Sequence, residues 1–462
     1  MTPRLTRGRA RTTPAATGAG QAASTFCPVC GTRVVAVGSE PPWCPACEWN
    51  LCAAPLQERR GWQSRRRRGA SPRSFGLDER LFDQVASNGP SRPGWSAGLL
   101  TVTVISVLLG AATIAVLVAG IVLVLRGPLL VRIGGALLVG LAVQLRPRLP
   151  RLEATAGYKS RTEVPALFAV VDAVAAQLSA PRVRAVVLDE SFGASCGRFG
   201  FSRRPVLVLG LPLWASLSAA GRVGLLAHQI AHLVDRDPEQ SLVPQPALST
   251  FGVLANALAG TARAMPGVGV PEGGGGVSAG EYAVLISGAL PPQRTFESLA
   301  AAWFAAALKP FYWVCAWADH QMRGLAAHAR QRAEYYADAL AVDVAGSAAV
   351  IEYCQALLLH EPVFTTARRL MRAGAGLDAV GRGTAETITS HAGEIALREQ
   401  HSMRTESSPL AGHPPVGRRL RMLRAQPTSG GKLTPGTFDF AAADAQLADD
   451  CRRVARALMH IP

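Results

Sequence analysis

Two histidines at helical spacing are the first residues in this chain whose types and positions could support metal chemistry. His228 and His232 lie four residues apart in the segment Gly224–Asp237, whose pattern is that of an amphipathic helix. Both imidazoles should therefore project from one face of the helix and could bind the same metal ion. Because most histidine pairs at this spacing are only solvated or packed in a core, the pair needs a third ligand to mark a metal site.

Two carboxylates with the same spacing occur further along the chain. Glu334 and Asp338 lie one turn apart on the helix expected over 332–346. A carboxylate from this helix would complete a His₂Glu site and leave the fourth position open for water or substrate. Asp338 then suits a supporting role, in which it accepts a hydrogen bond from a ligand imidazole and fixes the tautomer. The alternative is that both acids are merely solvated on a surface helix.

The order of these motifs resembles that of a known enzyme family. The chain is similar to the HtpX and CAAX-prenyl-protease type of membrane zinc endopeptidase in three ordered motifs: His228-x-x-x-His232, Glu334-x-x-x-Asp338, and His413-Pro414-Pro415 followed by Arg418-Arg419-Leu420. The resemblance covers residues 150–425 and includes the apolar hairpin before them. It implies an α+β, zincin-like metalloprotease domain that is mainly helical with a small β-sheet.

The resemblance also assigns roles to individual residues. The zinc ligands that it implies are His228, His232 and Glu334. It places Asp338 behind these ligands as a supporting residue. By the same likeness, His413 helps to stabilise the oxyanion and Arg419 braces the site.

Two residues depart from the family's pattern. The family has a glutamate where this chain has Gln229, and that glutamate takes a proton from zinc-bound water and passes it to the leaving amine. A carboxamide can hydrogen-bond this water but cannot carry protons near neutral pH, and general acid–base catalysis is typically worth ~10²–10⁴ in rate. The second departure is Glu190. The family usually has an asparagine there, on an edge strand beside the substrate, and Glu190 would place a negative charge at that position.

A separate cysteine-rich unit is expected over residues 25–53. Cys27 and Cys30 form one Cys-x-x-Cys pair and Cys44 and Cys47 form another, with thirteen residues between the pairs. Four thiolates in such pairs form a closed tetrahedral zinc site, which would hold together a segment too short for its own core. An iron site of the rubredoxin type and four independent thiols are the alternatives. The total of nine cysteines, without a disulfide framework, fits a reducing compartment.

Two apolar segments indicate a transmembrane hairpin over residues 96–146. Ser96–Leu125 carries no charged residue and is longer than the ~20 residues that a helix needs to cross a bilayer. Leu129–Leu145 is shorter and contains Arg132, which could reach the interface. Because positive charge flanks both outer ends, the hairpin would leave the N-terminus and the large domain in the cytoplasm. If the second segment failed to cross, the large domain would move to the other side.

Composition and charge describe the segments around the hairpin. The chain has 462 residues and a formal net charge of +16, and residues 1–95 contain fourteen arginines against six acidic residues. We read residues 1–24 as a disordered basic tail and residues 54–95 as a linker with a short helix around Leu77–Val85. A basic flank beside an apolar segment needs no nucleic acid to explain it.

Residues 150–462 are predicted to form one domain. The helices expected in it cover 215–235, 295–345, 347–360 and 438–459, and the strands cover Val183–Leu188 and Pro205–Leu209. Met265–Gly280, which is rich in glycine and proline, is predicted as a loop. Ala300–Ala318 is apolar and aromatic, and we favour a buried core helix there over a helix that dips into the membrane.

The leading hypothesis is a membrane-anchored, zinc metalloendopeptidase-like protein that is catalytically weak or inactive because its base position holds Gln229. It would bind a polypeptide substrate or client at the bilayer, and we expect two zinc ions per chain. One alternative is an active enzyme that recruits another acid, such as Glu190 or Asp235. The other is a membrane-tethered interaction protein that acts through its zinc ribbon. The sequence does not specify the oligomeric state.

Overall fold

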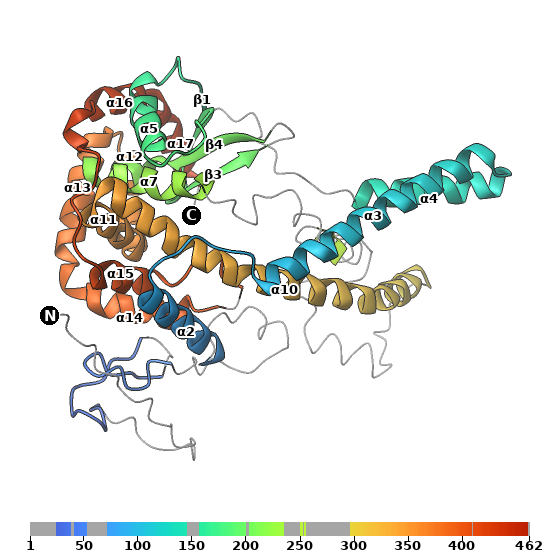
Figure 1. Cartoon of the computed structure of the whole chain (residues 1–462), viewed down its shortest axis with the longest axis horizontal. Helices are drawn as coiled ribbons and strands as arrows, with labels where there is room; N and C mark the ends of the chain where they lie inside the picture. Colours follow the sequence, from blue (N-terminus) through green and yellow to red (C-terminus); the bar gives the residue numbers. More distant parts are fainter. Residues whose placement is uncertain are drawn as a thin grey trace. The chain divides into compact units, whose positions relative to one another are not determined.

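The computed structural model of the chain describes residues 25–37, 41–52, 72–145, 157–199, 203–234, 250–252, 254–255, 296–408 and 410–460. The chain divides into two units, Met1–Gln57 and Glu58–Pro462. The described part is mainly helical with one small sheet of four strands (Figure 1). This confirms the predicted mixture of many helices and a small sheet. The predicted tail at 1–24, the loop Met265–Gly280 and the acid Asp235 lie outside the described residues.

The first unit folds around its cysteines. Two short antiparallel bridges pair Phe26 with Arg33 and Val35 with Trp43. The indole of Trp43 is fully buried, and Leu51 is buried as well. A core of this size is too small to hold a fold without a cross-link or a metal, so the cysteines must supply the remaining stability.

The second unit begins, in its described part, with helix α2 (Pro72–Asn88). This helix is longer than the short one predicted in the linker. Its side chains Leu81 and Val85 are buried in a cluster with Tyr335 and Met422, which belong to the large domain. The segment before the apolar hairpin is therefore packed onto the domain over this helix.

Helices α3 (Ala97–Arg126) and α4 (Leu129–Leu145) form an antiparallel pair. They touch through their backbones where Gly120 and Gly135 meet, because a Cβ on Gly120 would lie 2.9 Å from the Gly135 carbonyl oxygen. Small residues at a crossing point allow this close approach in membrane helices. Arg132 lies in the first turn of α4 and donates from Nε to the Gly127 carbonyl at 2.9 Å.

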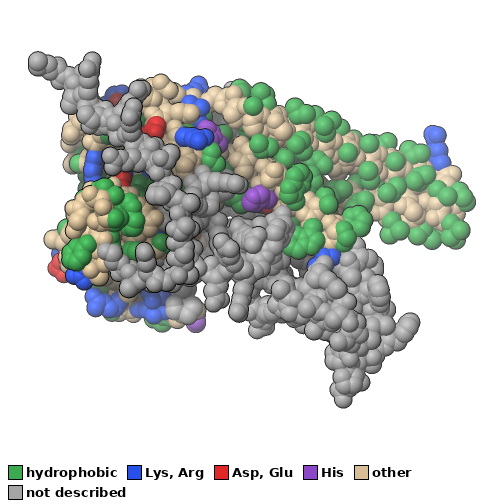
Figure 2. Space-filling view, turned by 90° about the horizontal axis from the view of Figure 1, so that it is seen from below, with side chains coloured by type: hydrophobic (Ala, Val, Ile, Leu, Met, Phe, Trp, Pro, Cys, Tyr) green, Lys and Arg blue, Asp and Glu red, His purple; other side chains and the backbone are tan. Residues whose placement is uncertain are grey.

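The surface of this helix pair is apolar. The exposed side chains on α3 and α4 include Val107, Leu108, Ile114 and Leu137, and Figure 2 shows hydrophobic side chains gathered there. Among the described helices, α3 alone is both long and apolar enough to cross a bilayer, and only 6% of its apolar window is buried. A single such helix is weak evidence for membrane association. At 17 residues, α4 falls short of the predicted second crossing.

The sheet of the second unit has the strand order β1-β2-β4-β3. Its strands are β1 (Tyr158–Lys159), β2 (Ala185–Asp189), β3 (Ala194–Phe199) and β4 (Arg204–Gly210). The two central strands, β2 and β4, run parallel, and the edge strands pair antiparallel to them. Both predicted strands are confirmed as this central pair, whose continuous apolar runs are largely buried on both faces of the sheet.

Helix α7 (Ala219–Val234) lies at the centre of the unit. It packs against β3, against α5 (Pro165–Gln177), and against α10 (Phe296–Ala345) and α11 (Ser347–Leu358). Neighbours on all these sides bury nearly every residue from Gly221 to Leu233, so the helix is more enclosed than an amphipathic surface helix would be. Gly224 permits the close packing, because a Cβ there would lie 2.9 Å from the carbonyl oxygen of Ala349 on α11.

Helix α10 crosses the unit as a continuous helix with Pro310 inside it. The apolar stretch Ala300–Ala318 was predicted to be a buried core helix, and in its described part this prediction is wrong. Phe311, Val314 and Trp317 are 65%, 64% and 57% exposed, respectively, on one side of the helix. Periodicity alone does not distinguish a stripe that faces a core from one that faces outwards.

The remaining helices wrap around this centre. They are α6 (Leu211–Ala215), α12 (His360–Arg372), α13 (Leu377–Ser390), α14 (Ile395–Thr405), α15 (Val416–Ala425), α16 (Phe440–Gln446) and α17 (Ala448–Met459). The helices predicted over 215–235, 295–345 and 347–360 are confirmed within a few residues. The predicted helix over 438–459 is two helices, α16 and α17, which meet at Leu447.

Candidate metal centre

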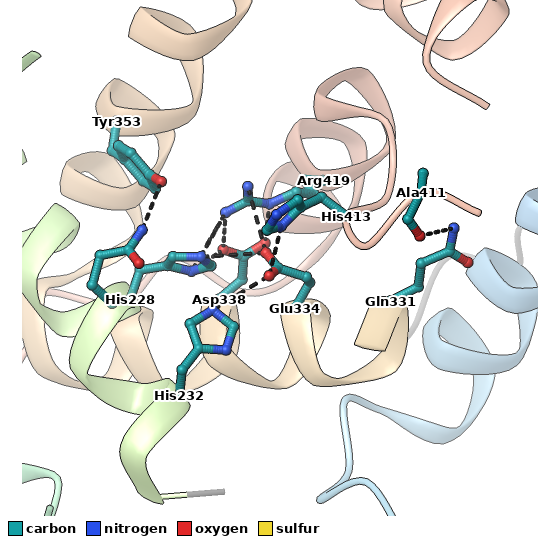
Figure 3. Close-up of polar contacts among 10 residues, drawn as sticks. His228, His232, Gln331, Glu334, Asp338, Tyr353, Ala411, His413 and Arg419 are labelled. Carbon is teal, nitrogen blue, oxygen red and sulfur yellow. Dashed lines mark hydrogen bonds and ion pairs between the residues drawn. The ribbon is translucent and has the colours of Figure 1, made fainter. Parts of the chain in front are cut away.

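The two histidines and the distant glutamate predicted as ligands come together between α7 and α10. His228 Nε2 lies 3.4 Å from Glu334 Oε2, and His232 Nε2 lies 3.3 Å from Glu334 Oε1. One donor atom from each residue lies within 4.8 Å of the others, which is close enough for all three to hold one metal ion. Figure 3 shows the three side chains converging from the two helices.

Asp338, predicted to support the ligands, holds the first of them. Its Oδ1 lies 2.8 Å from His228 Nδ1, on the ring edge opposite the metal position. A carboxylate at that distance keeps the ring proton on Nδ1, so that Nε2 presents its lone pair to a metal. Burial and Arg419 lower the pKa of His228, but the carboxylates of Asp338 and Glu334 together outweigh both and raise it.

Arg419 closes the network from α15. Its Nε and Nη2 donate to the two oxygens of Asp338 at 2.8 and 2.6 Å, a bidentate pair between two buried side chains. Burial alone would raise the pKa of Asp338, but the Arg419 guanidinium and His228 outweigh burial and lower this pKa. Arg419 therefore holds Asp338, a contact that fits the bracing role implied by the resemblance, and that role stays a prediction.

One carboxylate oxygen of Glu334, Oε2, accepts no hydrogen bond, and this fits a site that binds a metal. Glu334 is buried, and although burial raises its pKa, the surrounding imidazoles, with His232 first among them, lower the pKa well below its usual value. Glu334 is therefore ionised, yet its Oε2 accepts no hydrogen bond, although His228 Nε2 and Arg419 Nη1 lie 3.4 and 3.8 Å away. A buried carboxylate oxygen without a hydrogen bond costs free energy, which a bound cation would offset. Two imidazoles and one carboxylate match the donors of a three-ligand zinc site, although this donor set alone does not identify the metal.

Gln229, the residue at the predicted base position, is buried beside His228. Its Nε2 donates to the hydroxyl oxygen of Tyr353 on α11 at 3.3 Å. The ring of Tyr353 also packs against His228, with the ring centroids 5.5 Å apart. Burial raises the pKa of Tyr353, so the phenol stays neutral and offers Gln229 a hydroxyl group rather than a charge. The hydrogen bond of Gln229 thus goes to a group that takes up no proton near neutral pH.

His413 reaches the site from the loop that precedes α15. Its Nδ1 lies 2.7 Å from Glu334 Oε1, while 75% of its side chain is exposed. It thus contacts Oε1, the carboxylate oxygen that also lies near His232, and faces solvent, where a substrate would approach. This position is compatible with the oxyanion role that the resemblance implied, and it adds a contact that the sequence did not predict.

Glu190, the second residue that departs from the family's pattern, follows β2 and is half-buried. It lies in the turn before β3, which is an edge strand of the sheet. Within the described part of the chain, Glu190 forms no hydrogen bond or ion pair with the metal ligands, and the predicted negative charge beside the substrate stays a prediction.

The four predicted cysteine ligands of the first unit also come together. Cys27 Sγ lies 3.6 Å from Cys47 Sγ, and Cys30 Sγ lies 3.4 Å from Cys44 Sγ. All four sulfur atoms lie within 4.8 Å of one another, which suits a tetrahedral metal site. The hydroxyl of Thr32 contacts Cys30, and hydrogen bonds with Thr32 lower the pKa of Cys30 to about 6, which favours the thiolate that a metal requires.

Comparison of the chain with known protein families, with curated proteins and with solved structures finds no match. The site therefore rests on its own geometry. Sequence reasoning missed three residues around the site: Tyr353 on α11, Asp78 on α2, and Gln331 on α10, one helical turn before Glu334. Their hydrogen bonds to Gln229, to one another and to Ala411 join segments that are distant in the sequence, so no local pattern marks them.

Proposed function

We propose that this chain is a membrane-anchored, zinc-binding protein of the HtpX and CAAX-prenyl-protease type whose peptidase step is weak or absent. One observation carries this proposal: three metal donors, His228, His232 and Glu334, converge beside an amide, Gln229, that cannot act as a base. Its ligand would be an extended polypeptide segment.

The separate roles of the residues around the metal position support a protein that binds peptide but cleaves it weakly or not at all. Zinc bound there would polarise a peptide carbonyl and acidify a water molecule. Asp338 keeps the proton of His228 on Nδ1, and Arg419 keeps Asp338 ionised. Gln229 can hydrogen-bond water or a peptide group, but it cannot accept the proton that cleavage releases. The site is thus suited to holding a peptide carbonyl without completing hydrolysis.

The membrane part of the proposal is a hairpin with both units in the cytoplasm. Helix α3 would cross the bilayer and α4 would return through it. Seventeen residues of α4 rise ~26 Å as a helix, a little less than the ~30 Å hydrocarbon core. Local thinning of the bilayer absorbs such a difference at modest cost. Arg132, at the turn end of α4, would lie at the far interface.

Zinc content tests the metal-binding part of the proposal. Metal analysis of the purified, detergent-solubilised chain should find two zinc ions, one at the cysteines and one at the histidines. His228→Ala should lose one ion, and the double variant Cys27→Ser with Cys30→Ser should lose the other. A zinc content that His228→Ala leaves unchanged would contradict metal binding between α7 and α10.

Peptidase activity tests the catalytic part. Wild-type protein should leave an unstructured substrate such as casein essentially uncut, and Gln229→Glu should raise the rate by ~10²–10⁴. The matched control adds His228→Ala to Gln229→Glu, which should abolish the gain because the metal is lost. Rapid cleavage by the wild type that a chelator stops, with no gain in Gln229→Glu, would instead identify an active enzyme with another base.

A further inference from the structure

Helix α2 lies outside the metal centre but packs against α10, which carries Glu334 and Asp338, and against α15, which carries Arg419. Leu81 and Val85 pack against Tyr335 of α10 and Met422 of α15. Tyr335 directly follows the ligand Glu334 in the sequence, so one turn of α10 faces the metal centre on one side and α2 on the other. The position of α2 is therefore coupled to the position of a metal ligand.

A hydrogen-bonded chain continues this contact to the loop of His413. The side chain of Gln331, on α10, is buried, and its Nε2 donates to Asp78 Oδ1 of α2 at 3.3 Å. The same amide nitrogen lies 3.4 Å from the carbonyl oxygen of Ala411, to which it also donates. Figure 3 shows Gln331 and Ala411 beside α2, with His413 further along the same loop. The amide of Gln331 thus joins α2 to the loop two residues before His413.

Arg418 makes a second connection between α2 and the site. Its Nη2 donates to the Phe75 carbonyl of α2 at 3.3 Å, and its guanidinium lies 4.7 Å from the centroid of the Phe75 ring. Arg418 is buried and directly precedes Arg419, which holds Asp338. Neighbouring arginines of α15 therefore face α2 and the metal centre respectively.

The burial of Asp78 has no evident benefit for stability. Burial raises the pKa of this carboxyl group, and contacts with Ser407 and Arg418 offset the rise only in part. A buried carboxylate in such surroundings lowers the stability of the fold at neutral pH. A role other than stability would explain why Asp78 is buried against Gln331. Gln331 bonds both to Asp78 on α2 and to Ala411 in the loop, so Asp78 can help to hold that loop.

We propose that α2 is a positioning element of the metal centre, in which Asp78 and Gln331 anchor the loop that holds His413 on Glu334. The inference rests on the metal centre of the proposed function, because His413 acts there through a ligand. His413 contacts Glu334 Oε1, whereas Oε2 accepts no hydrogen bond and would be available to a metal. Partners that orient a metal ligand in this way typically contribute 10–100-fold to metal affinity. Gln331 and Asp78 are positioning residues and do not touch the metal.

Hydrogen exchange in the full chain tests whether the anchor exists, with or without zinc. The reporter amides are those of Leu410, Ala411 and Val416, which donate hydrogen bonds within the loop region. Gln331→Leu should accelerate their exchange by about tenfold or more, while peptides from α7 and the sheet keep their rates. The matched control, Asp83→Asn, changes an exposed carboxylate of α2 and should leave the loop unaffected. Unchanged loop exchange, or an increase across the whole domain, would overturn the proposal.

A double-mutant cycle on zinc affinity tests whether the anchor acts through His413. Full-length protein carrying Cys27→Ser and Cys44→Ser leaves one zinc site to measure, by competition with a chelator. His413→Ala and Gln331→Leu should each weaken zinc binding, by about tenfold and by several-fold. The double variant should bind no more weakly than His413→Ala alone, whereas additive losses would show that Gln331 does not act through His413. If no zinc binds at this site at all, the proposed function fails, and the exchange experiment still decides whether α2 anchors the loop.

Discussion

Separating the buried pair of Asp338 and Arg419 would measure what holds the metal centre together before any metal binds. Both side chains are buried, and two hydrogen bonds of 2.8 and 2.6 Å join them. Replacing one partner with an apolar residue of similar size, as in Asp338→Leu or Arg419→Met, leaves the other charge in the core. Breaking a buried pair in this way typically costs ~3–5 kcal/mol of folding free energy.

The structure predicts that the two single variants differ. After Arg419→Met, Asp338 keeps His228 Nδ1 at 2.8 Å, and a protonated imidazole can compensate its charge. After Asp338→Leu, Arg419 keeps only a distant carboxylate, Glu334 Oε2 at 3.8 Å. Asp338→Leu should therefore lie at the upper end of the range and Arg419→Met at the lower end. The double variant removes both charges and should cost less than the sum of the singles, by ~2 kcal/mol or more.

Equilibrium urea unfolding of chelator-treated protein in detergent, followed by tryptophan fluorescence, gives the three free energies. Arg382→Met is the matched control, because Arg382 pairs with Asp378 on the exposed face of α13. Loss of such a surface pair should cost ~0–1 kcal/mol. The interpretation of Asp338 and Arg419 as a buried, mutually dependent pair would be refuted by either of two results. One is a loss in unfolding free energy under ~1 kcal/mol for the single variants. The other is a loss for the double variant equal to the sum of the single losses.

Three further changes have definite expected outcomes. Asp78→Asn should raise the melting temperature near neutral pH and lose this advantage as the pH falls. The pKa of Asp78 is raised, so the wild type becomes less stable as the pH rises through that pKa. Melting curves at several pH values measure the difference. Gly417→Ala should cost ~1–3 kcal/mol, because a Cβ there would clash with the Glu399 carbonyl oxygen of α14, and chemical unfolding measures the loss. Cys27→Ser should remove zinc from the first unit only, and trypsin should then cut residues 25–52 faster, with the α7 region unaffected.

Local pattern predicted the ligand set because each half of it is encoded within one helix. A spacing of four residues places His228 and His232 on one face of α7 and Glu334 and Asp338 on one face of α10. Their order along the chain, with His413 and Arg419 after them, supplied the pairing of these helices through the resemblance. The strands β2 and β4 could also be predicted from the sequence. Both faces of these central strands are covered, so each strand appears as a continuous apolar run.

Other features could not be predicted because they depend on contacts between distant segments. The edge strand β3 has the sequence ASCGRF, which contains no run of β-branched residues and forms a strand only by pairing with β4. The hydrogen bond from Gln229 to Tyr353 and the bond from Gln331 to Asp78 join residues more than a hundred positions apart. Whether the aromatic stripe of α10 faces the core or the outside likewise depends on what the fold places beside it.

The charges of the centre give a physical meaning to the amide at position 229. Without metal, the buried carboxylates of Glu334 and Asp338 already share the centre, with Arg419 and the surrounding imidazoles to offset their charge. A glutamate at the buried position 229 would add a further negative charge to the metal-free site, whereas bound zinc would offset it. Gln229→Glu should therefore lower the stability of the metal-free protein and increase its stabilisation by zinc. Melting curves with and without chelator measure both effects, and a variant whose metal-free form is as stable as the wild type would show that solvent already screens this position.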